Sequence, residues 1–228
     1  MVKVKFCGIR RTEDIEAVNR LKPDLAGFVF AKSRRQVTKE QAAALKELLD
    51  PGIKTVAVLV NMPVEEAAAL ANTGIADLLQ LHGDEDATYI AKLKTLTGSK
   101  IIKAIRLRNG GLPVQENGAG EGVYTANAGL LAEAVQADYY LFDTFLPDTY
   151  GGTGKTFSLS LLKGMRIEKP FLLAGGLDAD NVAEIIRQVQ KDETLRPNFY
   201  GVDVSGGIET DGYKDTVKME AFMKAIRG

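Results

Sequence analysis

The sequence predicts an α/β fold of one kind, a single (β/α)8 TIM barrel, in which parallel strands alternate with helices. Three observations support this prediction. The chain has 228 residues, within the roughly 200–250 that such barrels commonly use. Eight short apolar, β-branched runs alternate with amphipathic stretches from end to end. Glycine-rich or charged residues follow nearly every run, as expected at the mouth of a barrel. An open doubly wound sheet gives a similar alternation, but the count of eight favours the closed barrel.

The predicted strands are compact and often apolar on both faces, which is typical of parallel strands buried on both sides. In chain order they are Val2–Phe6, Leu25–Phe30, Ile53–Val60, Leu78–Leu81, Ile101–Ile105, Tyr139–Phe142, Phe171–Leu173 and Phe199–Val204.

The segments between the strands carry signals for helices. Thr38 and Gln41 form a capping-box pattern, which marks a helix start. Pro63 suits the first turn of the next helix. Besides the helix after Thr38, the predicted helices are Thr12–Leu21, Val64–Ala71, Asp84–Leu96, Ala128–Ala137, Asp178–Gln190 and Asp215–Ile226, with Phe157–Leu162 as the shortest candidate.

No strong linker divides the chain, so we expect residues 1–228 to form one domain. The exception to the regular pattern is the segment 107–127, which is rich in glycine. It is too polar for a core and too long for a routine connection. We interpret it as a loop insertion before the fifth helix.

Composition excludes several classes of protein and site. The formal net charge is -1 and the pI about 6.0, so no basic field would attract nucleic acid. There is no 18-residue apolar run to span a membrane and no signal-peptide pattern, so we expect a cytoplasmic protein. With one Cys and one His, an internal disulfide, a cysteine-clustered zinc site and a His-rich metal site are excluded.

Two proton-transferring side chains follow predicted strands. Cys7 ends the first apolar run and Asp143 ends the sixth. Each alone has an ordinary explanation, since a lone Cys is often a small buried hydrophobe and an Asp often forms a turn. In a closed barrel, however, all strand carboxyl ends open onto one mouth. The two residues are therefore a candidate acid/base pair.

Glycine pairs follow the last two predicted strands, at Gly175-Gly176 and Gly206-Gly207. Glycine lets backbone N–H groups approach an anion, and barrels frequently bind phosphate between these two loops. Tyr150–Thr156 resembles a nucleotide P-loop, but the first glycine of that motif would fall at Thr149. The segment fits better as another loop near a phosphate than as an ATP site.

Several segments, in order along nearly the whole chain, resemble the phosphoribosylanthranilate isomerase family of tryptophan biosynthesis. They are Val4–Ile9, Gly27–Phe30, Ser33–Arg35, Gln80–Gly83, Phe142–Thr144, Gly151–Phe157, Ala174–Leu177 and Gly201–Ser205. The resemblance implies a (β/α)8 barrel that acts without metal or organic cofactor. It also implies an Amadori rearrangement of N-(5-phosphoribosyl)anthranilate to 1-(2-carboxyphenylamino)-1-deoxyribulose 5-phosphate.

The family motifs also imply residue roles. Asp143 matches the general acid and Cys7 the general base, while Arg35 matches the residue that holds the anthranilate carboxylate. The matching phosphate loops contain Gly154, Gly175, Gly176, Ser205 and Gly206. Cys7 would have to become a thiolate, which cationic surroundings favour, whereas Asp143 would have to hold a proton.

Other interpretations remain open at this point. The chain could be another phosphosugar barrel, such as the imidazole-pathway aldose–ketose isomerase or indole-glycerol-phosphate synthase, or a catalytically silent scaffold. Cys7 at the first strand argues against both enzymes. We favour a structural or loop-positioning role for His82 over a catalytic one, because the proton-transfer roles are filled. The expected assembly is a monomer or homodimer that binds a small phosphorylated substrate.

Overall fold

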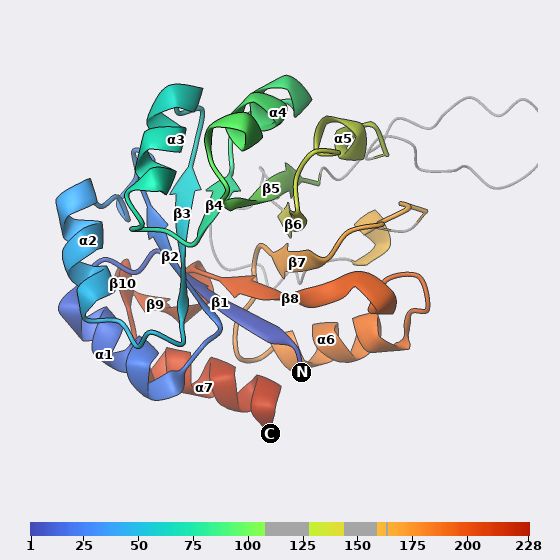
Figure 1. Cartoon of the computed structure of the whole chain (residues 1–228). Helices are drawn as coiled ribbons and strands as arrows, with labels where there is room; N and C mark the ends of the chain where they lie inside the picture. Colours follow the sequence, from blue (N-terminus) through green and yellow to red (C-terminus); the bar gives the residue numbers. More distant parts are fainter. Residues whose placement is uncertain (108–127, 144–158, 163) are drawn as a thin grey trace, which may run out of the picture.

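The computed structural model describes residues 1–107, 128–143, 159–162 and 164–228, and its strands form a closed parallel barrel (Figure 1). Each strand pairs with the next along the chain, and β8 pairs with β1 to close the barrel. The predicted (β/α)8 barrel is therefore confirmed.

All eight barrel strands occur where the apolar runs predict them, and no end differs by more than one residue. They are β1 Lys3–Cys7, β2 Leu25–Val29, β3 Lys54–Leu59, β4 Leu78–Leu81, β5 Lys100–Arg106, β6 Tyr139–Asp143, β7 Phe171–Ala174 and β8 Phe199–Val204. Cys7 and Asp143 are the last residues of β1 and β6, so both lie at the carboxyl end of the barrel.

Helices cover the outside of the barrel. They are α1 Thr12–Leu21, α2 Lys39–Glu47, α3 Val64–Asn72, α4 Ala87–Leu96, α5 Ala128–Glu133, α6 Val182–Lys191 and α7 Thr216–Arg227, with short 3-10 helices η1 Leu159–Leu162, η2 Arg196–Asn198 and η3 Gly206–Ile208. The capping box is confirmed, because the Thr38 hydroxyl accepts from the Gln41 backbone N–H and the Gln41 side chain accepts from the Thr38 N–H.

Two predicted helix starts are too early. Asp86 accepts a hydrogen bond from the Tyr89 N–H and caps α4, so the helix begins at Ala87. Asp178 accepts from the N–H groups of Asp180 and Asn181, which forms a turn before α6. In both cases an Asp side chain competes for backbone N–H groups and delays the helix.

A small hairpin after β8 was not predicted. It pairs β9 Glu209–Thr210 with β10 Tyr213–Lys214. Asp211 and Gly212 form the two-residue turn, with φ angles of 52° and 80°. Asp-Gly is a preferred pair for such a turn because both positions need positive φ. The hairpin brings Glu209 and Lys214 to the mouth of the barrel, as described below.

The core has two parts. One cluster fills the space between the strands and the helices and includes Phe6, Phe28, Phe142 and Phe222. The other fills the barrel itself with side chains from successive strands: Leu25, Val56, Leu78, Ile102, Ala104, Leu141, Leu172 and Ala174. These side chains fill the barrel interior below the mouth.

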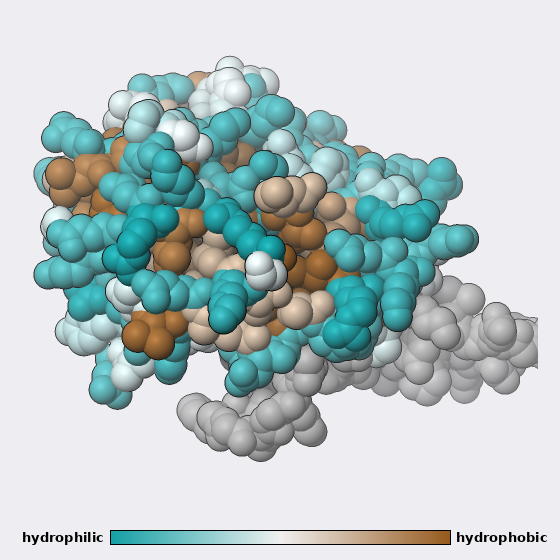
Figure 2. All heavy atoms as spheres, turned by 90° about the horizontal axis from the view of Figure 1, so that it is seen from below, coloured by the Kyte–Doolittle hydropathy of each residue, from teal (hydrophilic) through white to brown (hydrophobic). Residues whose placement is uncertain are grey.

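The side of the molecule that carries α6, α7 and the chain ends is seen in Figure 2, where apolar groups gather near the centre within a hydrophilic surround. A hollow of about 390 Å³ lies between the N-terminal residues, α6 and α7. The described residues that line it include no thiol, carboxylate or imidazole, so it is not a candidate for acid/base chemistry. In the described part of the chain, no helix has the length and apolar character needed to cross a membrane.

Candidate functional site

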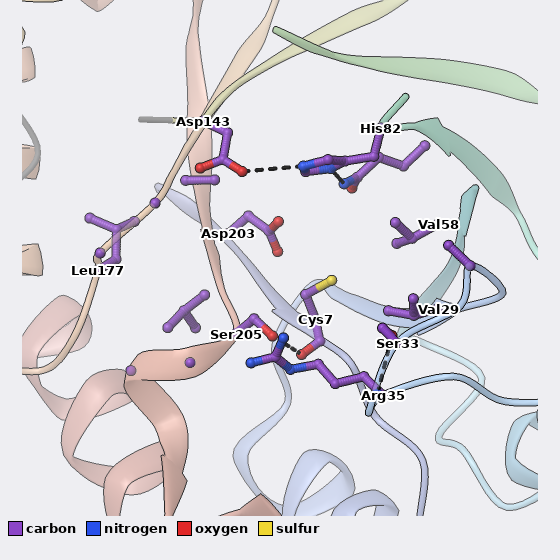
Figure 3. Close-up of a pocket in the computed structure, with 18 of the residues that line it drawn as sticks. Cys7, Val29, Ser33, Arg35, Val58, His82, Asp143, Leu177, Asp203 and Ser205 are labelled. Carbon is purple, nitrogen blue, oxygen red and sulfur yellow. Dashed lines mark hydrogen bonds and ion pairs between the residues drawn. The ribbon is translucent and has the colours of Figure 1, made fainter. Parts of the chain in front are cut away.

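A cavity of about 890 Å³ opens at the carboxyl ends of the strands (Figure 3). Its size suits a small-molecule ligand. Every predicted site residue that the structure describes lines this cavity: Cys7, Arg35, Asp143, Gly175, Gly176, Ser205 and Gly206. Gly154 lies outside the described residues. The structure therefore brings these residues to one mouth, and their roles stay predictions.

Asp143 is held from one side by His82. The His82 Nε2 lies 3.2 Å from the Asp143 Oδ2, and its Nδ1 lies 2.8 Å from the Gln80 Nε2. These two contacts link Gln80, His82 and Asp143 in one chain, in which the direction of donation depends on the tautomer of His82. His82 thus lies against the Asp143 carboxyl group and restricts its orientation. The positioning role expected for His82 fits this contact.

Cys7 ends β1 above a buried ion pair. Lys5 lies two residues earlier on the same face of the strand and is fully buried, and its Nζ donates to the Asp203 Oδ1 at 2.9 Å. A Cβ placed on Gly27 would stand 3.1 Å from the Cys7 Sγ and 3.2 Å from the Lys5 Nζ, so the thiol and the ammonium converge on this glycine. Figure 3 shows the Cys7 sulfur and the Asp143 carboxylate projecting into the same space, with Asp203 drawn between them.

Burial and charge act on Cys7 in opposite directions. Burial raises the pKa of the Cys7 thiol above its ordinary value, while the charges of Lys5 and Lys214 lower it. Burial would likewise lower the pKa of Lys5, but Asp203 and Cys7 outweigh it, so the pKa is raised and Lys5 stays an ammonium. The cationic surroundings expected for Cys7 are therefore present, although burial dominates and, together with the Asp203 charge, leaves the pKa of the thiol raised.

The Arg35 side chain passes over Gly8, directly after the end of β1. A Cβ on Gly8 would stand 2.6 Å from the Arg35 Cδ, so only glycine, here at φ 83°, lets the side chain lie there. The guanidinium donates from Nε and Nη2 to the two carboxylate oxygens of Glu209, at 2.7 and 2.8 Å. These hydrogen bonds raise the pKa of Arg35, which therefore stays charged.

The two glycine loops lie against each other. Gly175 and Gly176 have φ angles of 89° and 66°, a region that favours glycine. A Cβ on Gly207 would stand 1.9 Å from the Leu177 carbonyl oxygen, so the loop after β8 packs directly on the loop after β7. The Ser205 hydroxyl donates to the Cys7 carbonyl oxygen at 3.0 Å, which ties this corner to the end of β1.

Sequence reasoning missed several charged residues here. The buried pairs are Lys5 with Asp203 and Lys214 with Glu209, the latter at 2.7 Å. A charged residue within an apolar strand was the available signal for Lys5 and Asp203. Among the described residues, no group of three His, Cys, Asp or Glu side chains could hold a metal ion.

Comparison with known proteins gives consistent matches. A sequence profile of N-(5′-phosphoribosyl)anthranilate (PRA) isomerase matches residues 4–225. The N-(5′-phosphoribosyl)anthranilate isomerase of Thermoanaerobacter sp. (strain X514) is 47% identical over 228 residues, which covers 100% of this chain and 99% of the relative. The crystal structure of phosphoribosyl anthranilate isomerase from Thermotoga maritima has a TM-score of 0.78 at 31% identity, with 100% of each chain covered. Another such isomerase, solved in complex with reduced 1-(o-carboxyphenylamino)-1-deoxyribulose 5-phosphate, has a TM-score of 0.73 at 28% identity, again with 100% of each chain covered.

Proposed function

The chain belongs to the N-(5′-phosphoribosyl)anthranilate isomerase family, and we propose that Asp143 is the general acid and Cys7 the general base of its reaction. The reaction is the Amadori rearrangement of N-(5′-phosphoribosyl)anthranilate to 1-(2-carboxyphenylamino)-1-deoxyribulose 5-phosphate in tryptophan biosynthesis. The observation that carries the residue assignment is the convergence of both side chains on one cavity.

The first step needs an acid. Asp143 donates its proton to the ribose ring oxygen, the C1–O bond breaks, and the anthranilate nitrogen forms a Schiff base with C1. His82 contacts the Asp143 carboxylate oxygen at 3.2 Å and stabilises the anion that this step leaves.

The second step needs a base. The Cys7 thiolate removes the proton from C2, and the electrons of that C–H bond neutralise the Schiff base to give an enolamine. Tautomerisation of the enolamine then yields the ketone. The buried Lys5 ammonium lowers the cost of the thiolate in a site where burial disfavours it.

The remaining parts of the site hold the two ends of the substrate. Arg35 is proposed to bind the anthranilate carboxylate, since a planar guanidinium matches that anion. The phosphate is proposed to bind at Gly175, Gly176, Ser205 and Gly206, where two loops present backbone groups side by side. Gly154 belongs to the same proposal through its family motif, and no metal or cofactor is needed for these steps.

We propose that residues 1–228 form one domain, because β1 to β8 form a single closed sheet and α7 packs on α1. The insertion expected at 107–127 lies outside the described residues, except for Leu107. A cytoplasmic location and a monomer or homodimer remain predictions.

The direct test follows the loss of substrate fluorescence when purified protein is added to N-(5′-phosphoribosyl)anthranilate in buffer with a chelator. We expect turnover with no added metal. Loss of activity in the chelator, with recovery on adding a divalent ion, would contradict metal-independent acid/base catalysis.

A further inference from the structure

Glu209, on the unpredicted hairpin, lies directly against Arg35. We propose that Glu209 is a positioning residue for the substrate carboxylate: it holds one edge of the Arg35 guanidinium so that the opposite edge faces the mouth. This inference rests on the proposed function, in which Arg35 binds the anthranilate carboxylate.

A guanidinium has two edges that can each donate a parallel pair of hydrogen bonds to a carboxylate. Glu209 occupies the edge formed by Nε and Nη2, at 2.7 and 2.8 Å. Among the described residues none accepts a hydrogen bond from the end formed by Nη1 and the second N–H of Nη2, so this end is open to another anion. Glu209 therefore determines both the plane of the guanidinium and the edge that a substrate can use.

Glu209 itself is firmly held. Its side chain is only 4% exposed, and its carboxylate accepts from the Lys214 Nζ at 2.7 Å and from the Arg34 Nη2 at 3.0 Å. The Lys218 Nζ donates to the Glu209 carbonyl oxygen at 2.7 Å, which ties the hairpin to α7. Burial would raise the pKa of Glu209, but hydrogen bonds from Arg35 and Lys214 outweigh it and lower the pKa to about 2. Glu209 is thus a fixed anion at neutral pH.

The Arg35 guanidinium, which Glu209 holds, lies near other parts of the proposed site. Its stem crosses Gly8 beside Cys7, and a Cβ on Gly206 would stand 3.9 Å from its Nη2. The guanidinium therefore lies close to both the proposed base and the loop after β8. A substrate with a carboxylate at one end and a phosphate at the other has its reacting carbons between those two anions.

Glu209 could instead compete with the substrate carboxylate for Arg35. The number of positive charges around Glu209 argues against such competition. Three cations, from Arg34, Arg35 and Lys214, surround the single Glu209 carboxylate. This corner keeps a positive excess after Glu209 is counted, so a second carboxylate can bind without displacing the first.

The test is steady-state kinetics of Glu209→Gln with the natural substrate, together with the inhibition constant of inorganic phosphate. We expect KM to rise about tenfold, since a charge-assisted hydrogen bond to Arg35 is lost. The value of kcat and the inhibition constant of phosphate should change less than KM, because Cys7, Asp143 and the two glycine loops are retained, although Lys214 loses its Glu209 partner and keeps only its bonds to Ser205. An unchanged or lower KM would overturn the inference, and a lower KM is the result that competition predicts.

Matched variants separate this inference from the proposed function. Glu220→Gln removes an exposed pair between the same residue types, since Glu220 binds Arg20 at 2.6 Å on the surface away from the mouth, and should leave KM unchanged. Arg35→Met should raise KM, and adding Glu209→Gln to it should raise KM no further. If Arg35→Met leaves KM unchanged, the carboxylate role of Arg35 is wrong. If Arg35→Met raises KM but Glu209→Gln does not, only the positioning role is wrong.

Glu209→Asp provides a second test in case Glu209→Gln does not fold. Glu209→Asp keeps the charge but is one methylene shorter, so it cannot span Arg35 and Lys214 as Glu209 does. We expect it to raise KM as well, with phosphate inhibition unchanged. A wild-type KM for Glu209→Asp would overturn the inference.

Discussion

The contact between the two glycine loops allows a quantitative prediction for Gly207→Ala. The new Cβ would stand 1.9 Å from the Leu177 carbonyl oxygen, 2.9 Å from its carbonyl carbon and 3.0 Å from the Asp178 Cα. All three are backbone atoms, which cannot rotate away as a side chain can. The loops after β7 and β8 must therefore separate by about 1 Å or more to relieve the overlap. A displacement of that size is enough to misplace donors that converge on one phosphate.

We expect Gly207→Ala to weaken the binding of inorganic phosphate at least about tenfold, because hydrogen bonds from the two loops can no longer reach one anion together. Isothermal titration calorimetry measures this affinity, with circular dichroism confirming that the variant is folded at the temperature used. Gly98→Ala is the matched control, since its Cβ would meet nothing within 4 Å. Wild-type phosphate affinity in folded Gly207→Ala would refute the proposal that the two loops form one phosphate site.

Two further predictions concern buried charges. Lys5→Met should slow alkylation of Cys7 by iodoacetamide roughly tenfold at pH 8, because the ammonium that lowers the pKa of the thiol is lost. Lys5→Met combined with Asp203→Asn also removes the Asp203 charge, which raises the pKa of the thiol, so it should slow alkylation less than Lys5→Met alone. An unchanged alkylation rate in Lys5→Met would show that Lys5 does not support the thiolate. The folded-state pKa of Glu209, about 2, lies below its ordinary value of 4.5, so its stabilising effect is complete above pH 4.5 and is lost as pH falls toward 2. The difference in urea midpoint between the wild type and Glu209→Gln should therefore narrow below pH 4.5, and a constant difference from pH 6 to pH 2.5 would contradict the assignment.

The fold was readable from the sequence because its determinants are local. Apolar runs identify the barrel strands, and the Thr38–Gln41 capping box identifies the start of α2. The ends of helices were less predictable, since at Asp178 an acidic side chain forms a turn where a helix start was expected. The hairpin after β8 was overlooked, although Asp211-Gly212 is a known turn pair for a two-residue connection.

The site was predictable only in part. Cys7 and Asp143 were identified because strand ends meet at one mouth of a barrel. The partners of these residues depend on contacts between distant segments, which the sequence pattern does not specify. Glu209 reaches Arg35 across 174 positions, and Lys5 reaches Asp203 across 198. Such pairs become visible only when the barrel closes between β1 and β8.

The account depends most on the acid/base pair, and the turnover of Cys7→Ala and Asp143→Asn tests it most directly. Proton transfer by a positioned group contributes roughly 10²–10⁴-fold to rate, so each variant should lose at least about 10²-fold in kcat while its fold, checked by circular dichroism, is retained. Substrate analogues should also protect Cys7 of the wild type from iodoacetamide, since the thiol lines the cavity. If both folded variants turn over at close to the wild-type rate, Cys7 and Asp143 are not the catalytic pair.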